Sequence, residues 1–206
     1  MGFPIVDSER DKLAKAFGLA KLPDGPVYAV IWTTTPWTIP SNVAVAVNVK
    51  ESYKRQEIDG GQVWVMEKAL DRLIQSGILP AKRRSVDSIK GSEMLGWEYD
   101  GPFDDIPLVK NTLGKYVHRI IDGEEVVTDT EGTGLLHVAP GAGVEDFKLG
   151  KTNKLPVISS IDEDASYLGD MGEFSGKNAK KHPELIIDSL KEIEGGIFLF
   201  TTQNYK

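Results

Sequence analysis

Short runs of β-branched and aromatic residues, closely spaced in the first third of the chain, limit its fold most. Residues 27–32 lie between turn residues at 24–26 and Pro36, residues 43–47 alternate valine with alanine, and residues 62–66 follow two glycines. Runs of this length, bounded by glycine and proline, are typical of β-strands. Similar runs later in the chain predict further strands at 116–121, 135–138, 157–161 and 197–201.

Two other segments repeat their apolar residues at helical spacing. Residues 67–75 place alanine, leucine and isoleucine on one helical face, and a glycine follows where a helix end is expected. Residues 179–193 show the same spacing through Ile186 and Leu190, ahead of a Gly-Gly pair. Both segments predict amphipathic helices. The stretch 91–107 has little periodicity and contains glycine and proline, so it predicts a covering loop.

The mixture of strands and helices bounds the fold class. A chain of 206 residues with 40% apolar content can bury the core of one large domain, and the sequence has no internal repeat or low-complexity tract. We therefore expect residues 1–206 to form a single domain. Its fold class is expected to be mixed α/β, centred on a β-barrel or strongly curved sheet and decorated with two or three helices.

Composition argues against several kinds of site. The chain has no cysteine, and its three histidines lie far apart without metal-ligand spacing, so we expect no metal site. A formal net charge of −7 argues against binding nucleic acid by bulk attraction, and the basic runs 82–84 and 177–181 are typical of solvated surface. No apolar run approaches the roughly 20 residues that span a bilayer. We expect a cytoplasmic protein that does not contact a membrane.

The segment WTTTPWT, residues 32–38, is the first with a chemical pattern. Pro36 restricts its own φ and pushes Thr35 toward an extended backbone, which holds the neighbouring hydroxyls in place. Hydroxyls beside a flat tryptophan suit a small polar ligand. The pattern also fits a threonine-rich strand end whose hydroxyls satisfy local backbone groups. From these residues alone, both interpretations stay open.

The second segment with a chemical pattern is residues 132–147. Glycines lie at both ends of its predicted strand, and a predicted helix begins near Val144. His137 lies in the strand, and Glu145 and Asp146 lie in the first turn of the helix. Such residues can form a binding or catalytic site. A core histidine, and acidic residues that favourably meet the helix dipole, explain the same pattern without any function.

Together, these segments resemble the editing insertion of the isoleucyl-tRNA synthetases, called connective peptide 1. The resemblance covers residues 27–205. Valyl and leucyl enzymes share this frame, but they typically carry Arg-Pro-Glu or Arg-Pro-Asp in place of Thr35-Pro36-Trp37, and they usually lack a histidine at the place of His137. The segments that carry the resemblance are WTTTPWT (32–38), SNVAVAV (41–47), GSEMLGWEY (91–99), GTGLLHVAP (132–140) and EDF (145–147).

The resemblance implies an activity, a substrate and a parent protein. The domain is expected to remove valine from misacylated tRNA(Ile) by ester hydrolysis, to exclude isoleucyl-tRNA(Ile) by size, and to need no cofactor. It is expected to act as a monomer within a larger class I aminoacyl-tRNA synthetase, whose ATP-binding HIGH and KMSKS motifs are absent from this sequence. The expected partners are the 3′ end of tRNA(Ile) carrying valine and the rest of the synthetase.

The same resemblance implies roles for individual residues. Asp146 is expected to bind the α-ammonium group of the amino acid. One departure from the family is Ala142, which stands where many members have a second histidine. The residues expected to surround the ester and the attacking water are Thr33, Thr34 and Thr35. Those expected to shape the pocket for the amino-acid side chain are Trp37, Thr38 and His137.

Two alternatives remain open at this point. The first is the editing domain of a valyl-tRNA synthetase that acts on threonyl-tRNA, and Thr35-Pro36-Trp37 and His137 argue against it. The second is a non-catalytic RNA-binding barrel that presents exposed aromatic and basic side chains to a single-stranded end. The net negative charge and an aromatic content of 8% argue against this second alternative.

Overall fold

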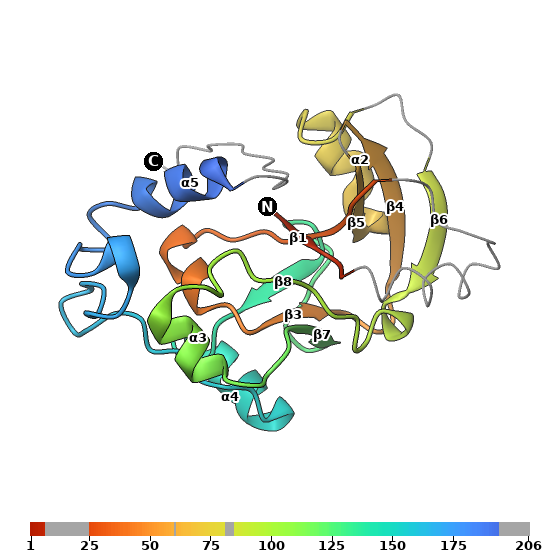
Figure 1. Ribbon diagram of the computed structural model, residues 1–206. Coiled ribbons are helices and arrows are strands. Elements are labelled where there is room, and N and C mark those ends of the chain that lie inside the picture. The colour runs from red at the N-terminus through yellow and green to blue at the C-terminus, as the bar shows by residue number, and fades with distance from the viewer. Residues whose placement is uncertain (7–24, 60, 81–84, 194–206) are drawn as a thin grey trace.

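The strands form two β-sheets (Figure 1). The computed structural model describes residues 1–6, 25–59, 61–80 and 85–193. The larger sheet has five strands in the order β1-β2-β5-β4-β6, in which β2 and β5 are parallel and the other neighbours are antiparallel. These strands are β1 (Gly2–Pro4), β2 (Val27–Val30), β4 (Ser52–Ile58), β5 (Gly61–Met66) and β6 (Ser85–Lys90).

The smaller sheet has three strands in the order β7-β3-β8. They are β3 (Ala44–Val47), β7 (Arg119–Asp122) and β8 (Leu135–Val138). The central strand β3 is parallel to β7 and antiparallel to β8, and it is buried at every position, which suits its short valine and alanine side chains. Trp32, two residues after β2, forms a bridge with Leu136 of β8. The chain that leaves the larger sheet therefore runs beside the smaller one.

Close backbone contacts around Gly134 join the two sheets. The Tyr53 hydroxyl of β4 donates a hydrogen bond to the Gly134 carbonyl (2.7 Å), and the Met66 N–H donates to the Thr133 carbonyl (2.8 Å). Gly134 has a φ of +78°, and a β-carbon at this position would overlap the β-carbon of Met66. Glycine is therefore required here, because any side chain would displace β5 or the loop before β8.

Helices surround the sheets (Figure 1). α2 packs against β4 and β5, α5 packs against η1, and α4 lies at the lower edge of the view, below the smaller sheet. None of the helices in the described residues is both long and apolar enough to cross a membrane. The α-helices are α2 (Glu67–Gln75), α3 (Pro107–Leu113), α4 (Val144–Asn153) and α5 (Glu184–Glu192), and the 3₁₀ helices are η1 (Pro36–Ser41), η2 (Gly91–Glu93) and η3 (Gly172–Phe174).

Most predicted elements are confirmed, with shifts at their ends. The strand predicted at 27–32 ends at Val30, and the strand predicted at 116–121 begins only at Arg119. The helix predicted at 179–193 begins at Glu184, because Pro183 takes the N-cap position and has no N–H to continue a helix. The segments confirmed to within one residue are 43–47, 62–66, 67–75 and 135–138.

The prediction of a strand at 157–161 is wrong. Within it only Ile161 forms a bridge, to Tyr167. The Ser160 carbonyl accepts a hydrogen bond from the Leu168 N–H (3.0 Å), and the Ser160 hydroxyl accepts one from Ser41 (2.6 Å). Ser160 is thus hydrogen-bonded to a loop residue and to a side chain rather than to a neighbouring strand. The strand predicted at 197–201 lies outside the described residues.

The mixed α/β class is confirmed, but the barrel is not. Among the residues that the structure describes, the strands form two sheets with open edges and no closed barrel is found. The edge strands are β1 and β6 in the larger sheet and β7 and β8 in the smaller one. Three strands and one α-helix of the described residues were not expected from the sequence, namely β1, β4, β6 and α3, and neither were the three 3₁₀ helices.

Candidate functional site

The two motifs with a chemical pattern meet at one cleft. The Trp32–Leu136 bridge brings residues 33–35 beside β8, and the start of α4 completes the lining. The cleft has a volume of about 490 Å³, which is in the range of small-ligand sites. Its lining residues are Trp32, Thr33, Thr34, Thr35, Thr38, Leu136, His137, Ala142, Gly143, Val144, Glu145 and Asp146.

The threonine hydroxyls of the cleft differ in their hydrogen-bond partners within the protein. Thr33 Oγ1 accepts a hydrogen bond from the Thr35 N–H (3.1 Å), and the Thr38 hydroxyl donates to the Thr35 carbonyl (2.8 Å), so both stabilise the turn into η1. Thr35 Oγ1 lies 3.3 Å from Thr33 Oγ1. The Thr34 side chain is exposed, and its hydroxyl has no hydrogen-bond partner in the described part of the chain. Thr34 can therefore donate to a ligand.

Both ring nitrogens of His137 are engaged by protein groups. The Asn42 amide nitrogen lies 2.7 Å from Nδ1, and Thr38 Oγ1 lies 3.1 Å from Nε2. The Tyr99 hydroxyl donates to Asn42 Oδ1 (2.5 Å), which fixes the orientation of the amide. Because an amide nitrogen only donates, Nδ1 accepts, and the neutral ring carries its proton on Nε2. That proton is donated to Thr38, whose own proton goes to the Thr35 carbonyl.

Burial keeps the His137 ring neutral. Removal from water lowers the pKa of His137 from 6.5 to about 4, and the contact with Thr38 opposes this shift only in part. The side chain is 5% exposed. Protonation at Nδ1 would also set two donors, from His137 and Asn42, against each other. A ring with no free lone pair cannot take a proton from water, so this geometry suits a wall of the cleft better than a general base.

We expect His137 to make the folded protein less stable in acid. The unfolded chain binds a proton below pH 6.5 and the folded chain only below about pH 4, so the free energy of unfolding falls as the pH drops through this window. The expected loss at about pH 4.5 is roughly 2 to 3 kcal/mol. Urea unfolding of wild type and His137→Asn, at neutral and at acidic pH, measures it. An equal loss in both proteins would contradict the assignment, since carboxyl groups are common to both.

Asp146 is the third residue of α4 and lines the cleft. Its Oδ2 accepts a hydrogen bond from the Ala139 N–H (2.8 Å), whereas Oδ1 has no hydrogen-bond partner among the described residues. Burial raises the pKa of Asp146, the Ala139 hydrogen bond opposes this, and the charge of Glu145 adds to it. No basic side chain of the described residues forms an ion pair with Asp146, and a half-buried carboxylate in this setting is stabilised by an ammonium group.

The remaining predictions concern Trp37, the two basic runs and metal-binding groups. Trp37 is not among the lining residues of the cleft, and its carbonyl accepts a hydrogen bond from the Tyr167 hydroxyl (3.1 Å). The basic run 82–84 falls outside the described residues, and Lys177, Lys180 and Lys181 are solvent-facing. Within the described ranges, no group of three or more histidine, aspartate or glutamate side chains is arranged to hold a metal ion.

Asn42 and Tyr99 were not expected from the sequence to support the site. Asn42 is 3% exposed, and it also donates to the Ala44 carbonyl (3.0 Å). A polar residue directly before a Val-Ala strand was the available signal, because such a residue needs partners if it is buried. No comparable signal marked Tyr99, which lies in the predicted covering loop.

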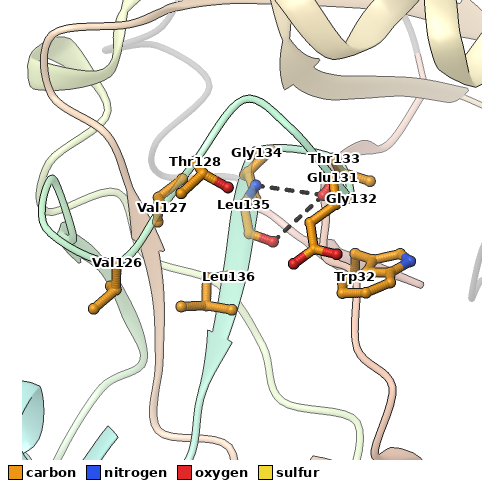
Figure 2. Close-up of a pocket in the computed structure, with 10 residues that line it drawn as sticks. All are labelled: Trp32, Val126, Val127, Thr128, Glu131, Gly132, Thr133, Gly134, Leu135 and Leu136. Carbon is orange, nitrogen blue, oxygen red and sulfur yellow. Dashed lines mark hydrogen bonds between the residues drawn. The ribbon is translucent and has the colours of Figure 1, made fainter. Parts of the chain in front are cut away.

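A smaller hollow adjoins the cleft and shares Trp32 and Leu136 with it (Figure 2). Its volume is about 70 Å³. The Trp32 ring and the Glu131 carboxylate lie on one side of β8, and Val126 and Val127 lie on the other (Figure 2). The Leu135 N–H donates to the Thr133 hydroxyl (3.3 Å), which stabilises the turn into β8. Trp32 and Leu136 therefore contribute to the lining of both depressions.

Curated relatives match one segment of much longer proteins. The isoleucine–tRNA ligase of Sulfolobus acidocaldarius is 36% identical over 165 residues, covering 80% of this chain and 16% of the ligase. The isoleucine–tRNA ligase of Symbiobacterium thermophilum is 35% identical over 190 residues, covering 92% of this chain and 18% of the ligase. The chain thus spans less than a fifth of the length of these relatives. No protein-family profile matches the chain.

Solved structures share the fold at low sequence identity. The crystal structure of GlLeuRS-CP1 has a TM-score of 0.71 at 13% identity and covers 98% of this chain and 99% of that chain. The editing domain of the P. knowlesi cytosolic leucyl-tRNA synthetase has a TM-score of 0.57 at 12% identity and covers 75% of this chain and 63% of that chain. The agreement over nearly the whole length of GlLeuRS-CP1 identifies the fold.

Proposed function

This chain belongs to the isoleucyl-tRNA synthetases, as a segment with the fold of a connective peptide 1 editing domain, and from that premise we propose that it hydrolyses valyl-tRNA(Ile). In this reaction water attacks the ester carbonyl carbon, the bond from that carbon to the ribose oxygen breaks, and a water proton passes to the ribose oxygen. The products are valine and tRNA. Isoleucyl-tRNA(Ile), which is one methylene larger, is spared.

A separate hydrolytic site is needed because binding alone separates valine from isoleucine poorly. One methylene in an apolar pocket is worth only about 1 to 3 kcal/mol, and isoleucyl-tRNA synthetases are the standard example of this limit. A second site that admits the smaller amino acid and rejects the larger one adds a separate selection step. The selectivity of the whole enzyme is then the product of the selectivities of the two sites.

One observation supports the proposal above all: a carboxylate and a hydroxyl, each with unused hydrogen-bonding capacity, line the same cleft. Oδ1 of Asp146 is available to accept a hydrogen bond from the α-ammonium group of valine. The hydroxyl of Thr34 is available to donate to the negative charge that develops on the ester oxygen. These two contacts would hold the ester between them.

None of the described side chains that line the cleft is well placed to act as a general base. His137 is neutral and engaged at both nitrogens, and one oxygen of Asp146 is engaged by Ala139. Glu145 is an exposed carboxylate at the rim. We therefore propose that the ribose hydroxyl next to the ester orients the attacking water, so that the substrate supplies a group that the described residues of the cleft do not offer.

Single-turnover deacylation of three charged tRNAs tests the function. We expect the chain to hydrolyse valyl-tRNA(Ile) and to act on isoleucyl-tRNA(Ile) at least about tenfold more slowly. A preference for threonyl-tRNA(Val) would support the domain of a valyl enzyme instead. Binding of all three tRNAs without hydrolysis above the uncatalysed rate would support a non-catalytic RNA-binding domain.

Thr34→Ala is expected to slow hydrolysis of valyl-tRNA by about 10²-fold, the usual effect of removing one donor to a developing oxyanion. Its free energy of unfolding should change by less than about 0.5 kcal/mol, because the hydroxyl is exposed. Thr33→Ala is the matched comparison and should lower stability by about 1 kcal/mol, since its hydroxyl accepts the Thr35 N–H. A full rate for folded Thr34→Ala would remove Thr34 from the reaction.

A further inference from the structure

Tyr99 reaches the site through a single hydrogen bond. It lies in the loop between η2 and α3, it is 1% exposed, and it is not among the lining residues of the cleft. Its hydroxyl donates to Asn42 Oδ1 (2.5 Å). Burial raises the pKa of Tyr99 well above its ordinary value of 10.0, so the hydroxyl keeps its proton and remains a donor.

Two neighbouring rings and the backbone hold Tyr99 in place. The Phe3 ring stacks on it with ring centroids 5.0 Å apart and an interplanar angle of 7°, and the His118 ring stacks on it at 5.1 Å and 28°. The backbone of Tyr99 forms a bridge with Ile5, and its N–H donates to the His118 carbonyl (3.2 Å). The position of the hydroxyl is therefore set by residues that do not line the cleft.

His118 is itself held by the same loop. It is 3% exposed, and its Nε2 lies 2.9 Å from Asp104 Oδ1. Asp104 Oδ2 accepts a hydrogen bond from the Gly101 N–H (3.1 Å), and a β-carbon at Gly101 would overlap the Asp104 carboxylate. Such close packing leaves the Tyr99 ring little room to move.

Asn42 transmits the position of Tyr99 to the wall of the cleft. Its amide nitrogen lies 2.7 Å from His137 Nδ1 and donates to the Ala44 carbonyl (3.0 Å), and its Oδ1 accepts from Tyr99. The amide is buried, so an Oδ1 without a donor would be costly. Without the Tyr99 hydroxyl, that oxygen can regain a partner only if the side chain turns. Turning breaks the contact with His137.

We propose that Tyr99 is a positioning residue that sets the amino-acid selectivity of the cleft, an inference that rests on the proposed function. Through Asn42, it holds the His137 ring in one orientation and one tautomer. A ring that can tilt or exchange tautomers yields to the extra methylene of isoleucine. The valine ester does not need that space, so its hydrolysis does not depend on Tyr99.

Tyr99→Phe tests the proposal, because it keeps the stacked ring and removes only the hydroxyl. Selectivity is measured as the ratio of the single-turnover rates on valyl-tRNA(Ile) and isoleucyl-tRNA(Ile) at saturating enzyme. We expect this ratio to fall by about 3- to 10-fold, within the range of one neutral hydrogen bond, while the valyl rate stays near that of wild type. In a His137→Ala background the same substitution should not change the ratio further, because the ring through which Tyr99 acts is gone.

A second measurement does not depend on activity. In nitrogen NMR of protein labelled at histidine, wild-type His137 should show a protonated Nε2 and an unprotonated Nδ1 as two separate signals. In Tyr99→Phe the two signals should move toward each other as the tautomers mix. The exposed His182, which hydrogen-bonds to Glu184, provides signals that should not move.

Tyr53→Phe is the matched control. It also removes a fully buried hydroxyl, but that hydroxyl donates to the Gly134 carbonyl, so selectivity and the His137 signals should stay as in wild type. Equal effects in both variants, or unchanged selectivity or unchanged His137 signals in folded Tyr99→Phe, would overturn the proposal. So would a further change in the His137→Ala background. If wild type hydrolyses no valyl-tRNA(Ile), the proposed function fails, and the His137 signals alone decide whether Tyr99 positions the ring.

Discussion

Asp146→Asn is expected to reduce hydrolysis of valyl-tRNA by about 10³- to 10⁴-fold in a protein that remains folded. A hydrogen bond to a charged group is worth about 1.5 to 3 kcal/mol, or roughly 10- to 150-fold. Loss of the ammonium contact also lets the ester shift relative to Thr34, and a misplacement of about 1 Å can cost a further factor of about 10². Single-turnover deacylation at saturating enzyme measures the combined effect.

The asparagine variant separates the charge of Asp146 from its structural contact. The amide oxygen of the introduced asparagine keeps the acceptor for the Ala139 N–H, so the unfolding curve of this variant should stay close to that of wild type. Asp146→Ala removes that acceptor as well and should lower stability by about 1 to 2 kcal/mol. Glu145→Gln changes the neighbouring, exposed carboxylate and should leave the rate nearly unchanged. Wild-type hydrolysis by folded Asp146→Asn would show that no ammonium group is bound there.

The sequence predicted the elements whose apolar residues form a continuous run or repeat with helix spacing. β3 was predicted from its run of valine and alanine, which is buried at every position, and α2 from alanine and leucine residues that repeat with helix spacing. β4 was missed because it buries polar residues in a central strand: Arg55 and Gln56 are each 1% exposed. The Arg55 Nη1 donates to Gln62 Oε1 of β5 (2.7 Å). Such polar burial depends on a neighbouring strand, which the local sequence does not reveal.

Most of the residues that the sequence indicated line one cleft, but their contacts were not expected. The motifs indicated Thr34, His137 and Asp146, and the structure brings all three to one cleft. The support for His137 comes from Tyr99 through Asn42, residues that are 57 positions apart in the chain. A hydrogen-bond network of this kind depends on how β3, β8 and the loop between η2 and α3 pack together. No spacing rule could therefore have assigned the proton to Nε2.

His137→Ala is expected to retain hydrolysis of valyl-tRNA(Ile) and to begin hydrolysing isoleucyl-tRNA(Ile). The imidazole is buried and held in a single orientation by Asn42 and Thr38, so it forms a rigid wall. A rigid wall rejects an extra methylene by steric overlap, which discriminates more sharply than loss of a favourable contact. Removing the ring should raise the isoleucyl rate by about 10- to 200-fold, the range that one methylene spans.

A general base would behave differently, because its removal costs about 10² to 10⁴ in rate on every substrate. Single-turnover deacylation of both tRNAs by wild type and His137→Ala separates the two roles. His137→Asn is the matched control: its amide oxygen can still accept from Asn42, but the shorter side chain no longer reaches Thr38. His137→Asn should also remove the steric block to isoleucine, and it should lower the free energy of unfolding less than His137→Ala does. An equal collapse on valyl-tRNA in both folded variants, with no gain on isoleucyl-tRNA, would assign His137 to the chemical step.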